Sequence, residues 1–300
     1  MRELVIDGRR IADDTPCYVV AELGNTHNGS LDIAKQLIDA CAKAGVDAVK
    51  FQKKTIEQLY TLALLSKPYD SEVSFGATYG KHKQALELNA DEITICAEEA
   101  SAGDVSCFAT GFDEHAIDDL MALGVPCLKI HSGGLTDPPL LRHAARQGVP
   151  LILSTGAATC DDIDKALDVI GNVPHAILHC TASYPVASDE LNLRVILTLR
   201  ERYPETVIGF SSHATGIWPS LVAYAFGARI IEHHVTLSRA MKGTDHGFSL
   251  EPKGLATLVE DLTSLRLALG DGVKRIYRSE WSAIGKLRRQ ATEDGWRIAG

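Results

Sequence analysis

Short apolar runs alternate with segments of helical periodicity along most of this chain. The runs are rich in β-branched and aromatic residues, which is typical of buried strands. The segments between them repeat apolar residues every three or four positions, and the first places Ile33, Leu37, Ile38 and Cys41 on one face and ends at Gly45. The eight strand-like runs are residues 17–24, 48–52, 106–112, 127–132, 151–156, 176–182, 207–213 and 229–237.

Eight strand–helix alternations predict an α/β fold, a (β/α)₈ TIM barrel with its parallel sheet closed on itself. A doubly wound open sheet is the structural alternative, but the chain has no Gly-rich dinucleotide fingerprint. Asp7 and Gly8 predict a short N-terminal hairpin, which we expect at the floor of the barrel. The long connection over residues 53–90 is expected to serve function.

Composition narrows the functional class. The net charge of −9 argues against a nucleic-acid-binding protein, which would normally have a basic face. The seven cysteines form no CxxC pair, which is typical of reduced thiols in the cytoplasm. No run reaches the roughly 18 apolar residues of a membrane span. We therefore expect a soluble cytoplasmic protein with no membrane or nucleic-acid partner.

The last strand-like run, "RIIEHHVTL", contains three groups that are costly to bury. Because side chains alternate along a strand, Glu232 and His234 share one face and His233 takes the other. His213 ends the preceding run at a matching position. Two imidazoles at neighbouring strand ends predict a metal site, with hydrogen-bonded structural histidines as the alternative.

Other strand ends add charge and hydroxyl groups. Lys50 and Gln52 share a face of one predicted strand, and Lys129 lies in another. Two lysines and several hydroxyls at a barrel mouth suit a ligand with a phosphate and a carboxylate. The alternatives are an ion pair of a buried lysine with Glu22 and turn roles for the hydroxyls. The hydroxyl-bearing positions are Thr110, Ser132, Ser154, Thr155, Thr181, Tyr184 and Ser211.

Five collinear motifs between about residues 17 and 270 together resemble the sialic acid synthase family. This family includes synthases of N-acetylneuraminate, legionaminate, pseudaminate and a spore-coat polysaccharide. The matching segments are "VVAELGNTHNGSLDIAKQLIDACAKAGVDAVKFQ", "LKIHSGGLTDPPLLRHAARQGVPLILSTGAAT", "HCTASYP", "GFSSHATGI" and "IEHHVTLSRAMKGTDHGFSLEP".

The resemblance implies condensation of phosphoenolpyruvate with an N-acylated amino hexose, giving a nine-carbon 2-keto sugar acid and phosphate. It implies a divalent cofactor, Mn²⁺ or Mg²⁺, and a homodimer. It assigns His213 and His234 as metal ligands and Glu22 as the catalytic carboxylate, with Glu232 near the metal. The phosphoenolpyruvate contacts that it implies are Lys50, Thr110, Lys129, Ser132, Ser154 and Ser211. Of these, Lys50 and Lys129 are also expected to be catalytic. The sugar contacts that it implies are Gln52, Tyr184 and Asp245.

This sequence departs from the family pattern at several points. Ala182 replaces the usual Asn or Ser, Ser212 replaces a common Asp, and "ATGFD" replaces STPFD. Residues 1–270 are expected to form the synthase barrel and residues 271–300 a basic linker-like tail, without the antifreeze-like domain that usually follows. We expect this basic run to form a solvated helix and tail; the alternative is that the tail, or a separate capping protein, takes the place of that domain.

Two other functions stay open at this point. One is a barrel aldolase or lyase in which Lys129 or Lys50 forms a Schiff base. The other is a non-catalytic protein that binds sugar acids. Borohydride trapping separates the first from the phosphoenolpyruvate reaction, and a phosphate-release assay separates the second.

Overall fold

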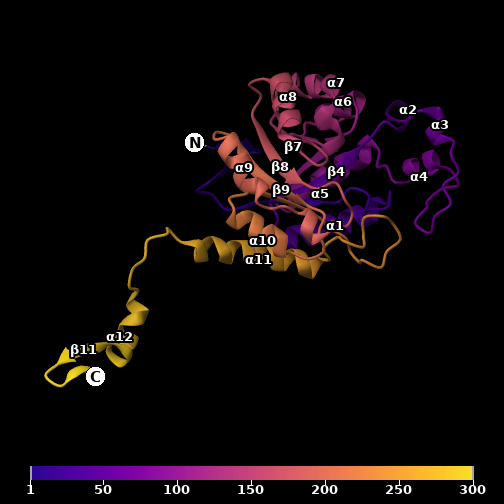
Figure 1. Cartoon of the computed structure of the whole chain (residues 1–300). Coiled ribbons are helices and arrows are strands. Elements are labelled where there is room, and N and C mark those ends of the chain that lie inside the picture. Colours follow the sequence, from indigo (N-terminus) through magenta and orange to yellow (C-terminus); the bar gives the residue numbers. More distant parts are fainter. Residues whose placement is uncertain (1, 299–300) are drawn as a thin grey trace. The chain divides into compact units, whose positions relative to one another are not determined.

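Eight parallel strands close into a barrel in the computed structural model, which describes residues 2–298 (Figure 1). The strand order β10-β3-β4-β5-β6-β7-β8-β9 follows the chain around the barrel. This closure confirms the predicted TIM barrel and excludes the open sheet. The strands are β3 (Tyr18–Glu22), β4 (Ala48–Lys53), β5 (Ser106–Gly111), β6 (Leu128–Ile130), β7 (Leu151–Ser154), β8 (His175–Cys180), β9 (Val207–Ser212) and β10 (Ile230–His234).

Helices follow the strands, and their ends are set by local chemistry. In α1 (Leu31–Ala44), the Ser30 side chain accepts a hydrogen bond from the Ile33 N–H, and Gly45 adopts φ 79° after the last turn. Six helices match predicted segments: α6 (Glu114–Ala122), α7 (Pro138–Ala145), α8 (Cys160–Ile170), α9 (Val195–Arg202), α10 (Trp218–Ala225) and α11 (Pro252–Leu269).

The connection after β4 has more regular structure than the sequence analysis predicted. It contains three short helices, α2 (Ile56–Leu59), α3 (Leu62–Leu65) and α4 (Tyr79–Ala85), before α5 (Ala90–Ala102). Helix α5 was not predicted from the sequence, although its start has a clear signal: Asn89 and Glu92 form a capping box.

The predicted hairpin is present as β1 (Glu3–Ile6) and β2 (Arg9–Ala12). Asp7 in its turn accepts a 2.7 Å hydrogen bond from the hydroxyl of Ser106, the first residue of β5. The hairpin therefore lies at the amino-terminal end of the barrel strands, as expected. Ile6 and Ile11 are fully buried, so apolar packing holds the hairpin there.

Strand register brings the polar residues of the opposite end together. Glu22 pairs with Lys50 on one side and with His234 on the other. Glu232 pairs with Ser211. In TIM barrels the carboxyl ends of the strands hold the active site, so these pairs mark the end at which to look for one.

The chain divides into two compact units, with the division at Leu265 and Arg266. The second unit contains the end of α11, a 3₁₀ turn (Arg278–Glu280), α12 (Trp281–Leu287) and a hairpin of β11 (Arg289–Thr292) and β12 (Gly295–Ile298). A solvated helix was expected in this part of the chain, and α12 matches it; the hairpin was not predicted. Among residues 2–298, no helix is both long and apolar enough to span a bilayer.

Candidate active site

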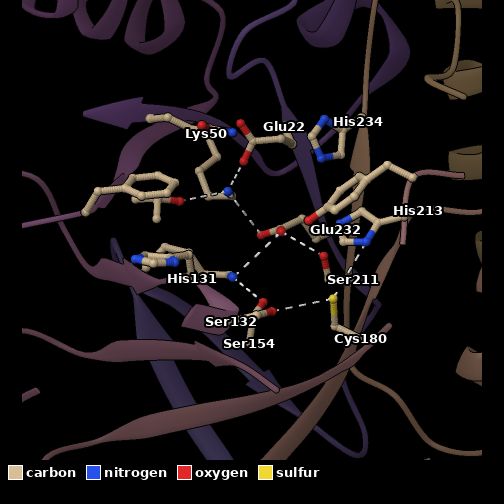
Figure 2. Close-up of a pocket in the computed structure, with 15 residues that line it drawn as sticks. Glu22, Lys50, His131, Ser132, Ser154, Cys180, Ser211, His213, Glu232 and His234 are labelled. Atoms are coloured by element: carbon tan, nitrogen blue, oxygen red, sulfur yellow. Dashed lines mark hydrogen bonds and ion pairs between the residues drawn. The ribbon is translucent and has the colours of Figure 1, made fainter. Parts of the chain in front are cut away.

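A pocket opens at the carboxyl ends of the barrel strands (Figure 2). Every barrel strand contributes to its lining, either from its last residues or from the residues just after it. Eleven of the twelve predicted site residues line it, and Asp245 is the exception. The lining residues are Glu22, Lys50, Gln52, Thr110, Phe112, Lys129, His131, Ser132, Ser154, Cys180, Tyr184, Ser211, His213, Glu232 and His234.

Two buried lysines and two buried glutamates occupy the floor of the pocket. The Lys50 ammonium forms an ion pair with Glu22, as the alternative interpretation of this lysine expected, and donates to Thr110 Oγ1 at 3.0 Å. It also lies 3.7 Å from Glu232. Lys129 donates to the Ser154 hydroxyl and lies 3.8 Å from Glu232.

Glu232 is the centre of this network, as the dashed lines of Figure 2 show. One of its oxygens accepts from Ser211 Oγ at 2.9 Å. The other oxygen, Oε2, is buried and has no hydrogen-bond partner within residues 2–298. Since a buried carboxylate oxygen is costly to leave without a hydrogen bond, this atom is available to accept one from a ligand or a water molecule.

Burial and charge shift the acidity of these groups. Burial lowers the pKa of Lys50 to about 7. Burial alone would raise the pKa of Glu232, but Lys129 and Lys50 bring it down to about 2. Glu232 is therefore an anion at neutral pH, while Lys50 can exist in either protonation state.

The two histidines predicted to bind metal are neighbours in the pocket wall, with their ring planes inclined at 62°. Their ring centroids are 5.5 Å apart. His213 Nδ1 donates to the Thr181 carbonyl at 2.8 Å, which leaves Nε2 with its lone pair. His234 Nδ1 is buried without a hydrogen-bond partner in the described part of the chain. Burial lowers the pKa of both rings, so both are neutral at pH 7, the form that binds metals.

Aromatic rings border the histidines. Phe248 packs edge-on against His234, with ring centroids 5.0 Å apart. Tyr184 covers His213 at 4.1 Å, although 55% of the tyrosine surface remains exposed. The pocket therefore has an apolar rim beside the imidazoles and a charged floor.

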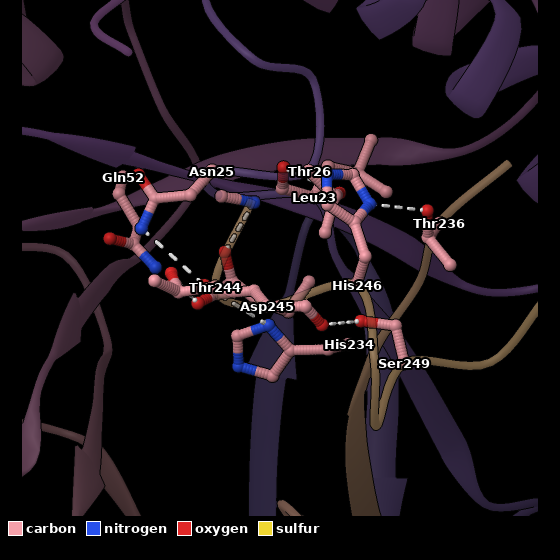
Figure 3. Close-up of polar contacts among 12 residues, drawn as sticks. Leu23, Asn25, Thr26, Gln52, His234, Thr236, Thr244, Asp245, His246 and Ser249 are labelled. Atoms are coloured by element: carbon pink, nitrogen blue, oxygen red, sulfur yellow. Dashed lines mark hydrogen bonds and ion pairs between the residues drawn. The ribbon is translucent and has the colours of Figure 1, made fainter. Parts of the chain in front are cut away.

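Asp245 lies just beyond the pocket lining, in the loop after β10 (Figure 3). Its Oδ2 is 3.9 Å from His234 Nδ1 and 3.4 Å from Asn25 Nδ2. The adjacent His246 fixes this loop, because its Nδ1 bonds the Thr236 hydroxyl at 2.7 Å and its Nε2 bonds Asn28 at 3.2 Å. The loops after β3 and β10 are thus joined beside the site.

Three lining residues were missed by the sequence analysis. Phe112 and His131 stack with ring centroids 4.2 Å apart, and Cys180 lies 3.8 Å from His213 Nδ1. The period-two rule could have found the first two, because Phe112 lies two residues after Thr110 and His131 two after Lys129.

Comparison with known proteins identifies relatives along most of the chain. A model described as the NeuB family matches residues 37–274. The human N-acetylneuraminate-9-phosphate synthase is 36% identical over 282 residues, which are 93% of this chain and 79% of that protein. The N,N'-diacetyllegionaminic acid synthase of Legionella pneumophila is 34% identical, over 92% of this chain and 80% of its own. A solved N-acetylneuraminic acid synthetase from Leptospira borgpetersenii, in complex with citrate, aligns with a TM-score of 0.83 and 33% identity, over 95% of this chain and 96% of that one.

Proposed function

This chain belongs to the NeuB family, and from that premise we propose that it condenses phosphoenolpyruvate with an open-chain N-acylated amino hexose. The products would be a nine-carbon 2-keto sugar acid and inorganic phosphate. Its relatives are named as synthases, which makes it an enzyme of the sialic-acid-synthase type. The observation that carries the proposal is the pair of buried lysines that meet at Glu232 on the barrel floor.

The lysines and nearby hydroxyls suit the two anionic groups of phosphoenolpyruvate. Lys50 with Thr110, and Lys129 with Ser154, form two cation–hydroxyl pairs. Ser132 adds a hydroxyl just after β6, and Ser211 adds one from a further strand, β9. Charge-assisted bonds from such groups are stronger than neutral ones, so together they would hold the phosphate and carboxylate and orient C3.

The carboxylates suit the reacting carbons. As enolpyruvate C3 forms a bond to the aldehyde carbon of the sugar, positive charge develops at C2 of phosphoenolpyruvate. The anions of Glu22 and Glu232 would stabilise that charge. The aldehyde oxygen, which gains the electron pair of the broken C=O bond, takes a proton from solvent. Water then adds to C2, and Glu22 takes one proton from it. The C2 hydroxyl loses its remaining proton as the C2–oxygen bond to phosphate breaks, which leaves the ketone and inorganic phosphate.

The two imidazoles fit a divalent metal, because each is neutral and one buried nitrogen, His234 Nδ1, has no hydrogen-bond partner in the described chain. Residues 2–298 hold no group of three or more His, Cys, Asp or Glu side chains suited to a metal. Ligands besides His213 and His234 would then be water or substrate oxygens. Mn²⁺ or Mg²⁺, when bound, would supply Lewis-acid polarisation of the aldehyde oxygen.

The sugar would lie toward Gln52, Tyr184 and Asp245. Asp245 lies 3.9 Å from His234 Nδ1, the Tyr184 ring lies 6.4 Å from the His234 ring, and Gln52 lines the pocket. The bonds of His246 to Thr236 and Asn28 hold the Asp245 loop in place.

A phosphate-release assay tests the proposal. The purified chain with Mn²⁺ should release phosphate from phosphoenolpyruvate only when an N-acyl hexosamine, such as N-acetylmannosamine or a diacetamido hexose, is present. Release without sugar, or no release with any sugar of this class, would refute it. Borohydride in the presence of pyruvate should leave Lys50 and Lys129 unmodified, and a reduced adduct on either lysine would favour a Schiff-base aldolase.

The pH dependence provides a first prediction. We expect kcat/KM for phosphoenolpyruvate to fall as the pH rises above about 7. Burial lowers the pKa of Lys50 to about 7, so the free enzyme carries the ammonium below that pH and loses it above. Only the charged form attracts an anion, and kcat/KM reports on the free enzyme.

Lys50→Arg is the matching control for this pH profile. A guanidinium stays charged to well above about pH 9, so the descending limb near pH 7 should disappear in this variant. If the descending limb near pH 7 remains in Lys50→Arg, the fall in kcat/KM is caused by the titration of a group other than Lys50.

A further inference from the structure

Lys54 is a buried lysine that the proposed reaction does not use. It is the first residue after β4 and is only 6% exposed. Its ammonium donates to Gln52 Oε1 at 2.9 Å and to Glu87 Oε1 at 3.3 Å, and lies 4.4 Å from the centre of the Phe112 ring. Two of these three partners, Gln52 and Phe112, line the pocket.

Lys54 is itself held in place. Glu87 accepts a hydrogen bond from the Lys54 backbone N–H at 3.1 Å with one carboxylate oxygen and contacts the ammonium with the other. The face of Phe112 adds a cation–π contact. Because a carboxylate and an aromatic ring fix the Lys54 ammonium, this group can hold the neighbouring Gln52 side chain in one orientation.

The chemistry of the ammonium determines which way the Gln52 amide faces. Lysine has only donors, so the amide atom that it contacts must be the oxygen. The NH₂ group of Gln52 is then directed away from Lys54. Glycine at position 24 makes room for the Gln52 side chain, because a Cβ there would lie 2.4 Å from Gln52 Cγ. Figure 3 shows Gln52 among the polar residues around Asp245.

We propose that Lys54 is a positioning residue that turns the Gln52 amide so that its NH₂ group donates to the sugar. The substrate group recognised there is then a hydrogen-bond-accepting oxygen, such as the carbonyl of the N-acyl group. A sugar that carries an ammonium group in place of this acceptor is rejected. This inference rests on the proposed function, which places the sugar beside Gln52. It adds a determinant of sugar specificity that makes no contact with phosphoenolpyruvate.

The first test removes the donors of Lys54 and keeps the chain length. In Lys54→Met, the KM for N-acetylmannosamine should rise about tenfold, the change expected for one lost hydrogen bond, while the KM for phosphoenolpyruvate stays within about twofold. Lys54→Arg should restore the sugar KM. Lys53→Met is the matched control, because Lys53 lies 3.8 Å from Asp119 on α6, and its sugar KM should not change.

The second test asks whether Lys54 acts through Gln52. In Gln52→Ala the sugar KM should rise, and adding Lys54→Met should raise it no further, whereas independent roles would give additive effects. Gln52→Glu keeps an oxygen for Lys54 and loses the NH₂ donor, so it should bind the sugar at least tenfold more weakly. Normal sugar affinity in Gln52→Glu, or additive effects in the double variant, would overturn the proposal.

Failure of the proposed function can be distinguished from failure of the Lys54 proposal, because the wild type would then show no sugar-dependent phosphate release. Crystal structures then decide the positioning claim: Gln52 should adopt one conformation in the wild type and a different one, or several, in Lys54→Met. An unmoved Gln52 side chain in that variant would overturn the inference without reference to activity.

Discussion

Replacing either His213 or His234 by alanine is expected to abolish turnover while the barrel stays folded. The centroids of the two rings are 5.5 Å apart, and both rings are neutral and available as ligands. Removing one leaves a single imidazole for the metal. Loss of groups that only support metal ligands already lowers metal affinity about 10–100-fold, so loss of a ligand should lower it at least as much.

Three measurements check this result together. Titration calorimetry with Mn²⁺ should show the loss of affinity, phosphate release should fall to background, and circular dichroism should show an unchanged fold. His175→Ala is the matched control, because His175 begins β8 at the opposite end of the barrel and bonds the Val173 carbonyl. Metal-dependent turnover that survives in either pocket variant would rule out the proposed two-histidine site.

Replacing Lys129 by methionine should weaken phosphoenolpyruvate binding much more than sugar binding. Lys129 is 2% exposed, donates to Ser154 and lies 3.8 Å from Glu232. Loss of a desolvated charge-assisted contact costs on the order of 2–5 kcal/mol. We therefore expect the dissociation constant for phosphoenolpyruvate to rise about 30-fold or more.

Titration calorimetry with phosphoenolpyruvate measures this change directly. Lys165→Met is the control, because the exposed Lys165 pairs with Asp162 on the surface of α8, and the affinity of this variant for phosphoenolpyruvate should match that of the wild type. Unchanged affinity in Lys129→Met would remove Lys129 from the anion site, and with it one of the two lysines proposed to bind phosphoenolpyruvate.

The barrel and the composition of its mouth were predictable because both follow from local periodicity. Alternation along 229–237 correctly placed Glu232 and His234 on one face, and the structure confirms that His233 is buried on the other, where it bonds the His234 and Gly216 carbonyls. Strand ends of a parallel barrel meet by topology, so residues far apart in sequence could be placed together without knowing their contacts.

What the sequence did not provide are contacts between loops. Asp245 was predicted with the sugar side, and the structure puts it beside His234 but outside the pocket lining. Its position depends on the bonds of His246 to Thr236 and Asn28, which lie in two different loops. The Lys54–Glu87 pair likewise joins residues 33 apart across the long connection. No periodic pattern encodes such pairings.

Within the second unit, the sequence predicted a solvated helix and a linker-like tail, and the structure adds a hairpin that was not predicted. Asp294 and Gly295, residue types typical of turns, lie at the end of its two-residue turn. Trp281 and Trp296 are both exposed in this unit. The functional division of the chain near residue 270 stays a prediction.

Oxygen-18 labelling tests the central claim most directly. The mechanism breaks the bond between C2 and the bridging oxygen, so that oxygen leaves with phosphate and solvent oxygen enters only the keto acid. In H₂¹⁸O with phosphoenolpyruvate, N-acetylmannosamine and Mn²⁺, mass spectrometry should find phosphate without ¹⁸O, released in equal amounts with a nine-carbon acid. Phosphate that carries ¹⁸O from the solvent would show cleavage at phosphorus and contradict the proposed condensation.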